Sequence, residues 1–363
     1  MRVDQYVTGF APRDAIGNHT LQVRRALRRA GYESDIWAEV AHPPLDRESR
    51  PYLEDTLGGG DRALLYQCST HSAMAPWLAS RADQGERLWL QYHNVTPARY
   101  FERWDRPAAR AIEGARQELA MLATRTERGL AVSAYNEKDL QAAGFPATAV
   151  CPLLVDLAEY HREPDRRLFD RLRRRRDRGG DQWLFVGRFV ANKCQHDLIG
   201  AFAAYRCLFD PAARLTPVGT GTQPRYRWAL ERLVHQLGLG RSVDFCSQLG
   251  DAQLLAHWAV ADVFVCLSEH EGFCVPVLEA MELGVPVVAY AATAVPETLG
   301  DAGILVTDKA PATVAEAVAE ACQPGHRRQE LIERGRQRAA GFTLEQTSAR
   351  LLEVVSNFTG GCG

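Results

Sequence analysis

Residues 263–281 read VFVCLSEHEGFCVPVLEAM, and they give the clearest indication of the fold class. The apolar run Val263–Leu267 has the length and composition of a buried strand. A polar loop follows it, and a helical pattern begins near Pro276, whose missing N–H is harmless in the first turn of a helix. A strand joined to a helix in this way is the unit from which parallel, helix-covered sheets are built.

The same rhythm of short apolar runs and helical patterns continues along the whole chain. In the first half, strands are predicted near 3–9, 34–38, 63–67, 87–93, 129–133 and 147–153, with helices such as 18–30 and 108–123. In the second half, strands are predicted near 183–186, 214–218, 242–245, 263–267, 285–289 and 303–306. The pattern predicts an α/β fold with two doubly wound, Rossmann-like domains.

The length of 363 residues also favours two domains over one. The polar, arginine-rich stretch 156–181 marks the boundary, and residues 343–357 form a final amphipathic helix. We therefore expect an N-terminal domain over 1–160, a second domain over 161–341, and a C-terminal helix within 342–363. Ligands of open α/β sheets bind at the carboxyl ends of the strands, so two facing sheets would form a cleft.

Composition excludes several classes of protein. The formal charge of −2 gives no reason to expect a nucleic-acid partner, and the nine cysteines lack the paired spacing of a disulfide framework or a zinc site. The N-terminus lacks the layout of a signal peptide, and no run of about 18 apolar residues occurs. We expect a cytoplasmic protein. Lysine occurs only at 138, 193 and 309, and the strong preference for arginine indicates a high-GC, bacterial genome.

The loop and helix start after residue 267 carry candidate ligand-binding groups. The backbone amides of Phe273, Cys274 and Val275 would point into the cleft, ready for an anion. Glu271 on the loop and Glu279 inside the helix could accept hydrogen bonds from hydroxyl groups of a hexose and a ribose. The alternative is an ordinary loop residue and a carboxylate that merely favours a helix N-terminus.

A second candidate group lies in LFVGRFVANK, residues 184–193, again at the end of an apolar run. Gly187 ends the strand, and Arg188 and Lys193 could approach a diphosphate. Fixed cations there would stabilise the charge that a leaving nucleoside diphosphate gains, without a metal. The alternative is that both are solvated surface charges.

Together these motifs resemble glycosyltransferase family four, a family of retaining enzymes. The resemblance rests on Val186-Gly187-Arg188 with Lys193, on Glu271-x7-Glu279, and on the segments 295–298 and 302–305. It implies the two-domain GT-B fold, a nucleotide-sugar site in the second domain, and a last helix that crosses back to the first. It also implies that Arg188 and Lys193 hold the diphosphate, Glu271 the transferred sugar, and Glu279 the ribose.

The resemblance extends more weakly to the first half. Gly17, in the turn after the first strand, matches a glycine-rich loop near the phosphates, although a helix entry capped by Asn18 is the simpler interpretation. His93, at the end of a strand, matches a histidine beside the reacting sugar, or is satisfied there by backbone groups. No Asp-x-Asp motif is present, so we expect neither a metal nor another cofactor. The resemblance implies that the donor's own β-phosphate would take the acceptor proton.

The sequence leaves the substrates open. Ser247 and Pro217 depart from the family pattern near the expected base-binding wall, so no nucleotide is assigned. The acceptor could be a glycan, a lipid-linked sugar or a small natural product. Aromatic residues of the first half are candidates for stacking on sugars, or belong to the core: Trp77, Tyr92, Tyr100, Phe101 and Trp104. Two competing functions are a nucleotide-sugar epimerase and a non-catalytic sugar-nucleotide binder.

Two arginine-rich segments raise the question of membrane contact. The segment Leu21–Arg29 could rest on anionic lipids at the inner face of a membrane, or present a solvated face. The run Arg173–Arg176 is interpreted as a solvated linker helix. The sequence thus predicts a peripheral membrane contact only as the less favoured alternative.

Overall fold

The computed structural model describes residues 1–59, 61–221 and 223–359. Its contacts divide the chain into two compact units. The first comprises Met1–Arg99, Arg106–Asp156 and the described residues from Phe342 onward; the second comprises Tyr100–Asp105 and Leu157–Gly341. Among the helices of these described ranges, none is both long and apolar enough to cross a membrane. The second unit thus takes one short segment from the middle of the first.

The first unit is built on a seven-stranded parallel sheet in the order β3-β2-β1-β4-β5-β6-β7. The strands are β1 Arg2–Phe10, β2 Ile36–Ala41, β3 Arg50–Pro51, β4 Arg62–Cys68, β5 Arg87–Tyr92, β6 Arg128–Ala131 and β7 Thr148–Val150. Six of them were predicted. β3 was missed because its two residues contain no apolar run.

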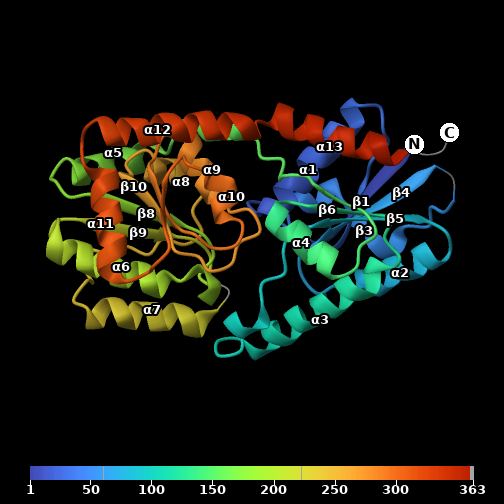
Figure 1. The fold of residues 1–363 in the computed structure, drawn as a ribbon, viewed down its shortest axis with the longest axis horizontal. Helices are drawn as coiled ribbons and strands as arrows, with labels where there is room; N and C mark the ends of the chain where they lie inside the picture. The colour runs from blue at the N-terminus through green and yellow to red at the C-terminus, as the bar shows by residue number, and fades with distance from the viewer. Residues whose placement is uncertain (60, 222, 360–363) are drawn as a thin grey trace. The chain divides into compact units, whose positions relative to one another are not determined.

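Helices cover both faces of this sheet (Figure 1). They are α1 Ala15–Arg29, α2 Met74–Asp83, α3 Arg106–Ala123, α4 Ala134–Ala142 and α13 Leu344–Thr359. On one face, Leu27 of α1 and Leu351 of α13 pack with Trp89 of the sheet. On the other, α2, α3 and α4 enclose a second core that includes Tyr92. The sheet is therefore buried on both sides, as parallel sheets require.

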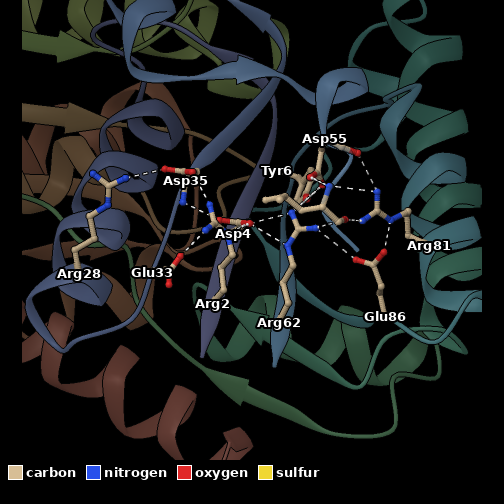
Figure 2. A network of polar contacts seen from close by, with 11 residues as sticks. Arg2, Asp4, Tyr6, Arg28, Glu33, Asp35, Asp55, Arg62, Arg81 and Glu86 are labelled. Carbon is tan, nitrogen blue, oxygen red and sulfur yellow. Dashed lines mark hydrogen bonds and ion pairs between the residues drawn. The ribbon is translucent and has the colours of Figure 1, made fainter. Parts of the chain in front are cut away.

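A network of buried charges joins β1 and β4 at the amino end of the sheet (Figure 2). The Arg62 guanidinium lies 2.9 Å from Asp4 and 2.8 Å from Asp55, and the side chains of both aspartates are fully buried. Tyr6 donates a hydrogen bond to Asp55 at 2.5 Å, and Arg2 donates one to Asp4 at 2.7 Å. Each buried carboxylate thus has at least two cationic or hydroxyl partners, which offset its desolvation.

The second unit repeats the plan with a five-stranded parallel sheet in the order β12-β11-β10-β8-β9. Its strands are β8 Gln182–Val186, β9 Arg214–Val218, β10 Val263–Cys266, β11 Val287–Tyr290 and β12 Ile304–Val306. The predicted strand at 242–245 is wrong: this segment makes only isolated bridges, from Val243 and Cys246 to β9.

Eight helices are described around this sheet. They are α5 Arg166–Arg176, α6 Gln195–Leu208, α7 Pro224–Gln236, α8 Asp251–Trp258, α9 Val275–Glu282, α10 Val295–Leu299, α11 Pro311–Cys322 and α12 His326–Ala339. The main core joins α6, α7 and α11 to the strands. The helix α9 packs on α12 and on α10. Two neighbouring helices thus hold α9 in place.

The interpretation of Arg173–Arg176 as a solvated linker is wrong for part of the run. These residues end α5, which packs on α8 through Leu172, Ala256 and Val260. Arg175 forms an ion pair with Asp244 at 2.5 Å, and Arg176 contacts Asp262. An apolar face and paired charges make α5 part of the second unit.

The predicted arginine face of α1 is also partly engaged within its own unit. Arg24 bonds to the carbonyl and the carboxylate of Glu48. Arg28 donates to the carbonyl of Ser34 and the carboxylate of Asp35 at 2.8 Å each. These contacts account for two of the arginines without a lipid surface.

Candidate functional site

The segment between β10 and α9 forms a closed, buried turn. Cys274 precedes the helix in the left-handed conformation with φ 71°, and Pro276 stands in the first turn, as predicted. Phe273 is buried, and its carbonyl accepts a hydrogen bond of 2.5 Å from the Thr298 hydroxyl. Val275, half-buried, is the first residue of α9. The candidate anion-binding amides therefore lie on a rigid turn at the carboxyl end of β10.

Lys193 and Glu271, which lie 78 residues apart in the sequence, meet in an ion pair of 2.5 Å between Nζ and Oε1. Both side chains are largely buried, with 15% and 8% of their surfaces exposed. Burial alone would favour the neutral amine, but the Glu271 carboxylate outweighs it and raises the pKa of Lys193. The pair is thus a fixed positive and negative charge at the ends of β8 and β10.

Backbone contacts hold these two charges in register. Lys193 ends the short 3₁₀ turn Ala191–Lys193, and Asn192 of that turn donates its side-chain amide to the carbonyl of His270 at 3.0 Å. The carbonyl of Asn192 accepts from the amide of Glu269 at 2.9 Å. The amide of Glu271 donates to the Thr293 hydroxyl at 2.9 Å. The segments that carry the two charges are thus fixed to each other by hydrogen bonds.

Glu279 has one satisfied and one open carboxylate oxygen. Its Oε1 accepts a hydrogen bond of 2.7 Å from the hydroxyl of Tyr160, which lies in the 3₁₀ segment Leu157–His161. Its Oε2 is buried and lacks a hydrogen-bond partner in the described residues. Burial raises the pKa of Glu279 to about 7, against the opposing effect of the Tyr160 hydrogen bond. Tyr160 had no signal in the sequence, because only folding brings it to the helix.

Gly187 and Arg188 lie at the end of β8. Gly187 has φ 155°, and a Cβ on Gly219 would lie 1.9 Å from its carbonyl oxygen, so the ends of β8 and β9 meet closely. Arg188 is exposed, and within the described ranges its guanidinium makes no ion pair. Its charge is thus available to a ligand.

Two cysteines join this group, although the sequence spacing indicated no metal site. The sulfur atoms of Cys266 and Cys274 lie 3.7 Å apart, and their ligand atoms and that of Glu271 lie within 4.8 Å of one another. By geometry these three could hold a metal ion. Glu271, however, is already neutralised by Lys193, so the cluster carries its own cation. The described cysteines are all free thiols.

In the first unit, His93 follows β5 and is 9% exposed. Gln5 donates its amide to the carbonyl of Thr20, and Gln67 donates to Gln5, so the oxygen of Gln67 is left to accept. The Nε2 of His93 lies 2.6 Å from that oxygen and must therefore carry the proton. The Nδ1 atom is then an acceptor, buried without a partner in the described residues.

His19 lies beside His93, with ring centroids 5.2 Å apart. Its Nδ1 accepts a hydrogen bond of 2.9 Å from the amide of Leu154. Burial lowers the pKa of His19 to about 4, and burial together with His19 lowers that of His93 well below its usual value. Both rings are thus neutral at pH 7. The sequence analysis singled out His93 but not His19.

Gly17 lies in the first turn of α1, where the helix closely approaches the backbone of Ala11. A Cβ there would lie 2.6 Å from the carbonyl oxygen of Ala11. The predicted cap is wrong, because Asp14 rather than Asn18 caps the helix. The Asp14 carboxylate accepts hydrogen bonds of 3.1 Å from the amides of Ile16 and Gly17. These amides are therefore already occupied by a carboxylate.

The aromatic candidates divide between the two units. Tyr92 is fully buried in the core of the first unit. Tyr100 and Trp104 belong to the second unit instead, where the ring of Trp104 packs on Tyr226 at 5.1 Å. Trp77 packs on Tyr6 at 5.7 Å. No local pattern in the sequence could assign Tyr100 and Trp104 to the second unit.

Part of the chain matches a family of known proteins. Residues 169–338 match the family "Glycosyl transferases group 1". A GDP-mannose-dependent alpha-(1-6)-phosphatidylinositol monomannoside mannosyltransferase of Mycobacterium tuberculosis is 32% identical over 219 residues, 57% of this chain and 55% of its own. A D-inositol 3-phosphate glycosyltransferase of Geodermatophilus obscurus is 32% identical over 255 residues, 67% and 54% respectively. The chain thus spans about half the length of these relatives.

Solved structures share the fold over nearly the whole chain. The Anabaena protein HepE, in complex with UDP-glucose, matches with a TM-score of 0.77 at 16% identity, over 98% of this chain and 100% of its own. Sucrose-phosphate synthase of Thermosynechococcus elongatus matches with a TM-score of 0.76 at 18% identity, over 99% and 100%. These likenesses, with the two parallel sheets, show the GT-B fold.

Proposed function

We propose that this protein transfers a hexose from a nucleoside diphosphate sugar to a hydroxyl group. The match of residues 169–338 to the group 1 glycosyl transferases and the GT-B fold support the proposal. The transfer retains the configuration of the anomeric carbon and needs no metal. The observation that carries the proposal is the buried Lys193–Glu271 pair at the strand ends of the second sheet. Side-chain packing alone would not require a pair of opposite charges at this position.

The cations are proposed to stabilise the leaving group. A nucleoside diphosphate gains negative charge as the glycosidic bond breaks, and fixed cations lower the energy of that transition state. Lys193 keeps its charge although it is buried, since Glu271 raises its pKa. Arg188 is exposed and has no ion pair among the described residues, and it supplies a second cation from the same loop as Lys193.

The carboxylates are proposed to hold the two sugars of the donor. Glu271 accepts hydrogen bonds from the hexose hydroxyls, and the open Oε2 of Glu279 accepts one from the ribose. Such a hydrogen bond favours the ionised form of Glu279, whose pKa of about 7 leaves it partly protonated without ligand. Donor binding should therefore release a fraction of a proton near pH 7.

The chemical step follows from these roles. The acceptor oxygen attacks the anomeric carbon on the face from which the diphosphate leaves, and the acceptor proton passes to the departing β-phosphate. A glycosidic bond forms between the anomeric carbon and the acceptor oxygen, the bond from the anomeric carbon to the phosphate oxygen breaks, and the configuration is retained. The neutral His93, with a free Nδ1, is proposed as a hydrogen-bond acceptor for a substrate hydroxyl. The relatives' donors support a nucleotide sugar, and the acceptor is a glycan, a lipid-linked sugar or a small natural product.

The first test is a panel of UDP-, GDP-, ADP- and dTDP-sugars, with EDTA present, followed by calorimetry and by release of the nucleoside diphosphate. We expect tight binding of one donor and slow hydrolysis without acceptor, with release of the α-anomer from an α-linked donor. An inverted product would contradict retention. Interconversion of donors without transfer would favour an epimerase, and no binding of any donor would favour a non-catalytic protein.

A matched pair of variants tests the site itself. Lys193→Met should lower turnover of the bound donor by about 100-fold or more, as for loss of a fixed transition-state charge. Lys309→Met is the control, because Lys309 is also held by two carboxylates of the second unit, Asp197 at 2.6 Å and Glu269 at 2.5 Å. Equal losses in both variants would show that the effect is structural.

A further inference from the structure

A cavity of about 490 Å³ lies within the second unit, between α5, α8 and the segment 244–249. Its size is that of a site for a small organic ligand. The residues proposed to bind the donor do not line it: Arg188, Lys193, Glu271 and Glu279 are absent from its walls. The cavity is therefore a separate feature, which we call the α5 cavity.

Arginines dominate the wall of the α5 cavity. Arg171, Arg174, Arg175 and Arg178 all line it, and their spacing of three and four residues places them along one side of α5 and its end. The single acidic residue of the wall, Asp244, is shared between Arg175 at 2.5 Å and Arg214 at 3.0 Å. The wall is thus strongly positive.

Three of these arginines lack a compensating charge. Arg171, Arg174 and Arg178 are exposed and form no ion pair within the described ranges. Like charges spaced by three or four residues repel each other and destabilise a helix. The Nε group of Arg175 is also buried without a hydrogen-bond partner in the described part of the chain. The cavity therefore combines excess positive charge with an unused donor.

The rest of the wall is neutral or apolar. His257 is buried, and burial, followed by the charges of Arg175 and Arg171, lowers its pKa to about 4, so it is neutral at pH 7. Leu168, Leu172 and Leu249 supply apolar surface. A suitable ligand thus pairs an anionic group with an uncharged body.

We propose that the α5 cavity binds the phosphate group of a phosphorylated molecule. A phosphate ester carries up to two negative charges on oxygens that several guanidinium groups can chelate at once. Its binding would relieve the repulsion among Arg171, Arg174 and Arg178. The phosphate comes either from a small soluble ester, such as a sugar phosphate, or from the headgroup of a lipid. Because binding favours the folded state, it also stabilises the second unit against unfolding.

The test uses glucose 6-phosphate and inorganic phosphate as soluble probes, glucose as the uncharged control, and phosphatidylcholine vesicles with or without phosphatidic acid. Binding is measured by calorimetry and vesicle sedimentation at physiological ionic strength. The cavity variant is R171Q/R174Q/R178Q. The matched control, R166Q/R167Q/R173Q, removes the same charge from exposed positions of the same helix that do not line the cavity.

We expect saturable binding of a phosphate probe to the wild type, a loss of about tenfold or more in the cavity variant, and a change below about threefold in the control. Lys193→Met should bind the probe as the wild type does, which separates this site from the donor site. Binding of glucose 6-phosphate identifies a soluble ester, and binding only to phosphatidic acid vesicles identifies a lipid phosphate. Equal weakening of both triple variants, or no binding of any phosphate probe, would overturn the proposal.

Discussion

Buried polar groups differ between the two ends of the first sheet in whether they have partners. At the amino end, Arg62 joins Asp4 and Asp55 in a network whose buried charges are matched (Figure 2). At the carboxyl end, His19 and His93 are buried as neutral rings, and each has a ring nitrogen without a hydrogen-bond partner in the described residues. The buried charges are thus paired at the amino end, whereas two ring nitrogens at the carboxyl end lack a hydrogen-bond partner among the described residues.

This difference separates residues committed to the fold from residues that we propose to contact a substrate. A buried charge network stabilises only while every partner is present, so its residues are committed to the fold. An unpaired polar atom in a buried place costs free energy, and a ligand that supplies the missing hydrogen bond would offset that cost. The second unit shows the same contrast in Glu279, with one oxygen bound to Tyr160 and one open.

The largest expected effect is at the amino end. Arg62→Met should destabilise the protein by about 3–5 kcal/mol, because it leaves two fully buried carboxylates without their shared cation. The measurement is urea denaturation. Arg87→Met is the control, since Arg87 also begins a strand but pairs with Glu127 nearer the surface; its cost should stay near or below about 1 kcal/mol. Similar losses in both would break the comparison.

The next effect concerns Glu279 and has a defined sign. Its pKa of about 7 in the fold exceeds the usual value of 4.5, so the native state binds more protons and loses stability as pH rises through that window. Glu279→Gln lacks this loss, and its stability relative to wild type should rise by up to ~3 kcal/mol between pH 5 and pH 8 without donor.

Thermal unfolding at both pH values checks this. The exposed Glu316→Gln on α11 is the control and should show no such trend. A wild-type curve that stays parallel to that of Glu279→Gln across the window would show that the carboxylate is not perturbed.

A smaller effect should follow the buried histidines. His19 and His257 have pKa values of about 4 in the fold, below the ordinary 6.5, so the unfolded state binds more protons and stability falls as pH drops from 6.5 toward 4. Between pH 7 and pH 5 each should cost ~2 kcal/mol. Replacing either by Gln should remove that share of the pH dependence in urea titrations. If the dependence of stability on pH is unchanged, the histidine ring is already protonated in the folded protein over this pH range.

The smallest effect tests the cap of α1. Asp14→Ala should cost ~1 kcal/mol, because the amides of Ile16 and Gly17 lose their acceptor. Thermal unfolding measures the loss. Asn18→Ala should change stability less, since Asn18 lies inside the helix rather than at its cap. The reverse order would restore the original assignment of the cap.

The sequence was most informative where structure is local. Apolar runs located most strands, and Pro276 marked the first turn of α9, because burial and backbone geometry act over a few residues. The two-residue β3 carried no such signal, and the 242–245 run was apolar enough to suggest a strand that does not form.

The sequence named the residues of the candidate site but not their arrangement. Spacing and resemblance singled out Lys193, Glu271 and Glu279, yet the ion pair and the Tyr160 contact join positions 78 and 119 residues apart. Likewise, the approach of Cys266 to Cys274 depends on how the loop folds back over the strand. Such contacts are set by the packing of the whole unit.

The segment Tyr100–Asp105 has a consequence for dissecting the gene. Since it belongs to the second unit while its neighbours on both sides belong to the first, the backbone passes from one unit to the other four times. A fragment that begins at Leu157 would lack Trp104, the partner of Tyr226. Neither unit is therefore a contiguous module, and a single cut in the coding sequence cannot free one without taking part of its core.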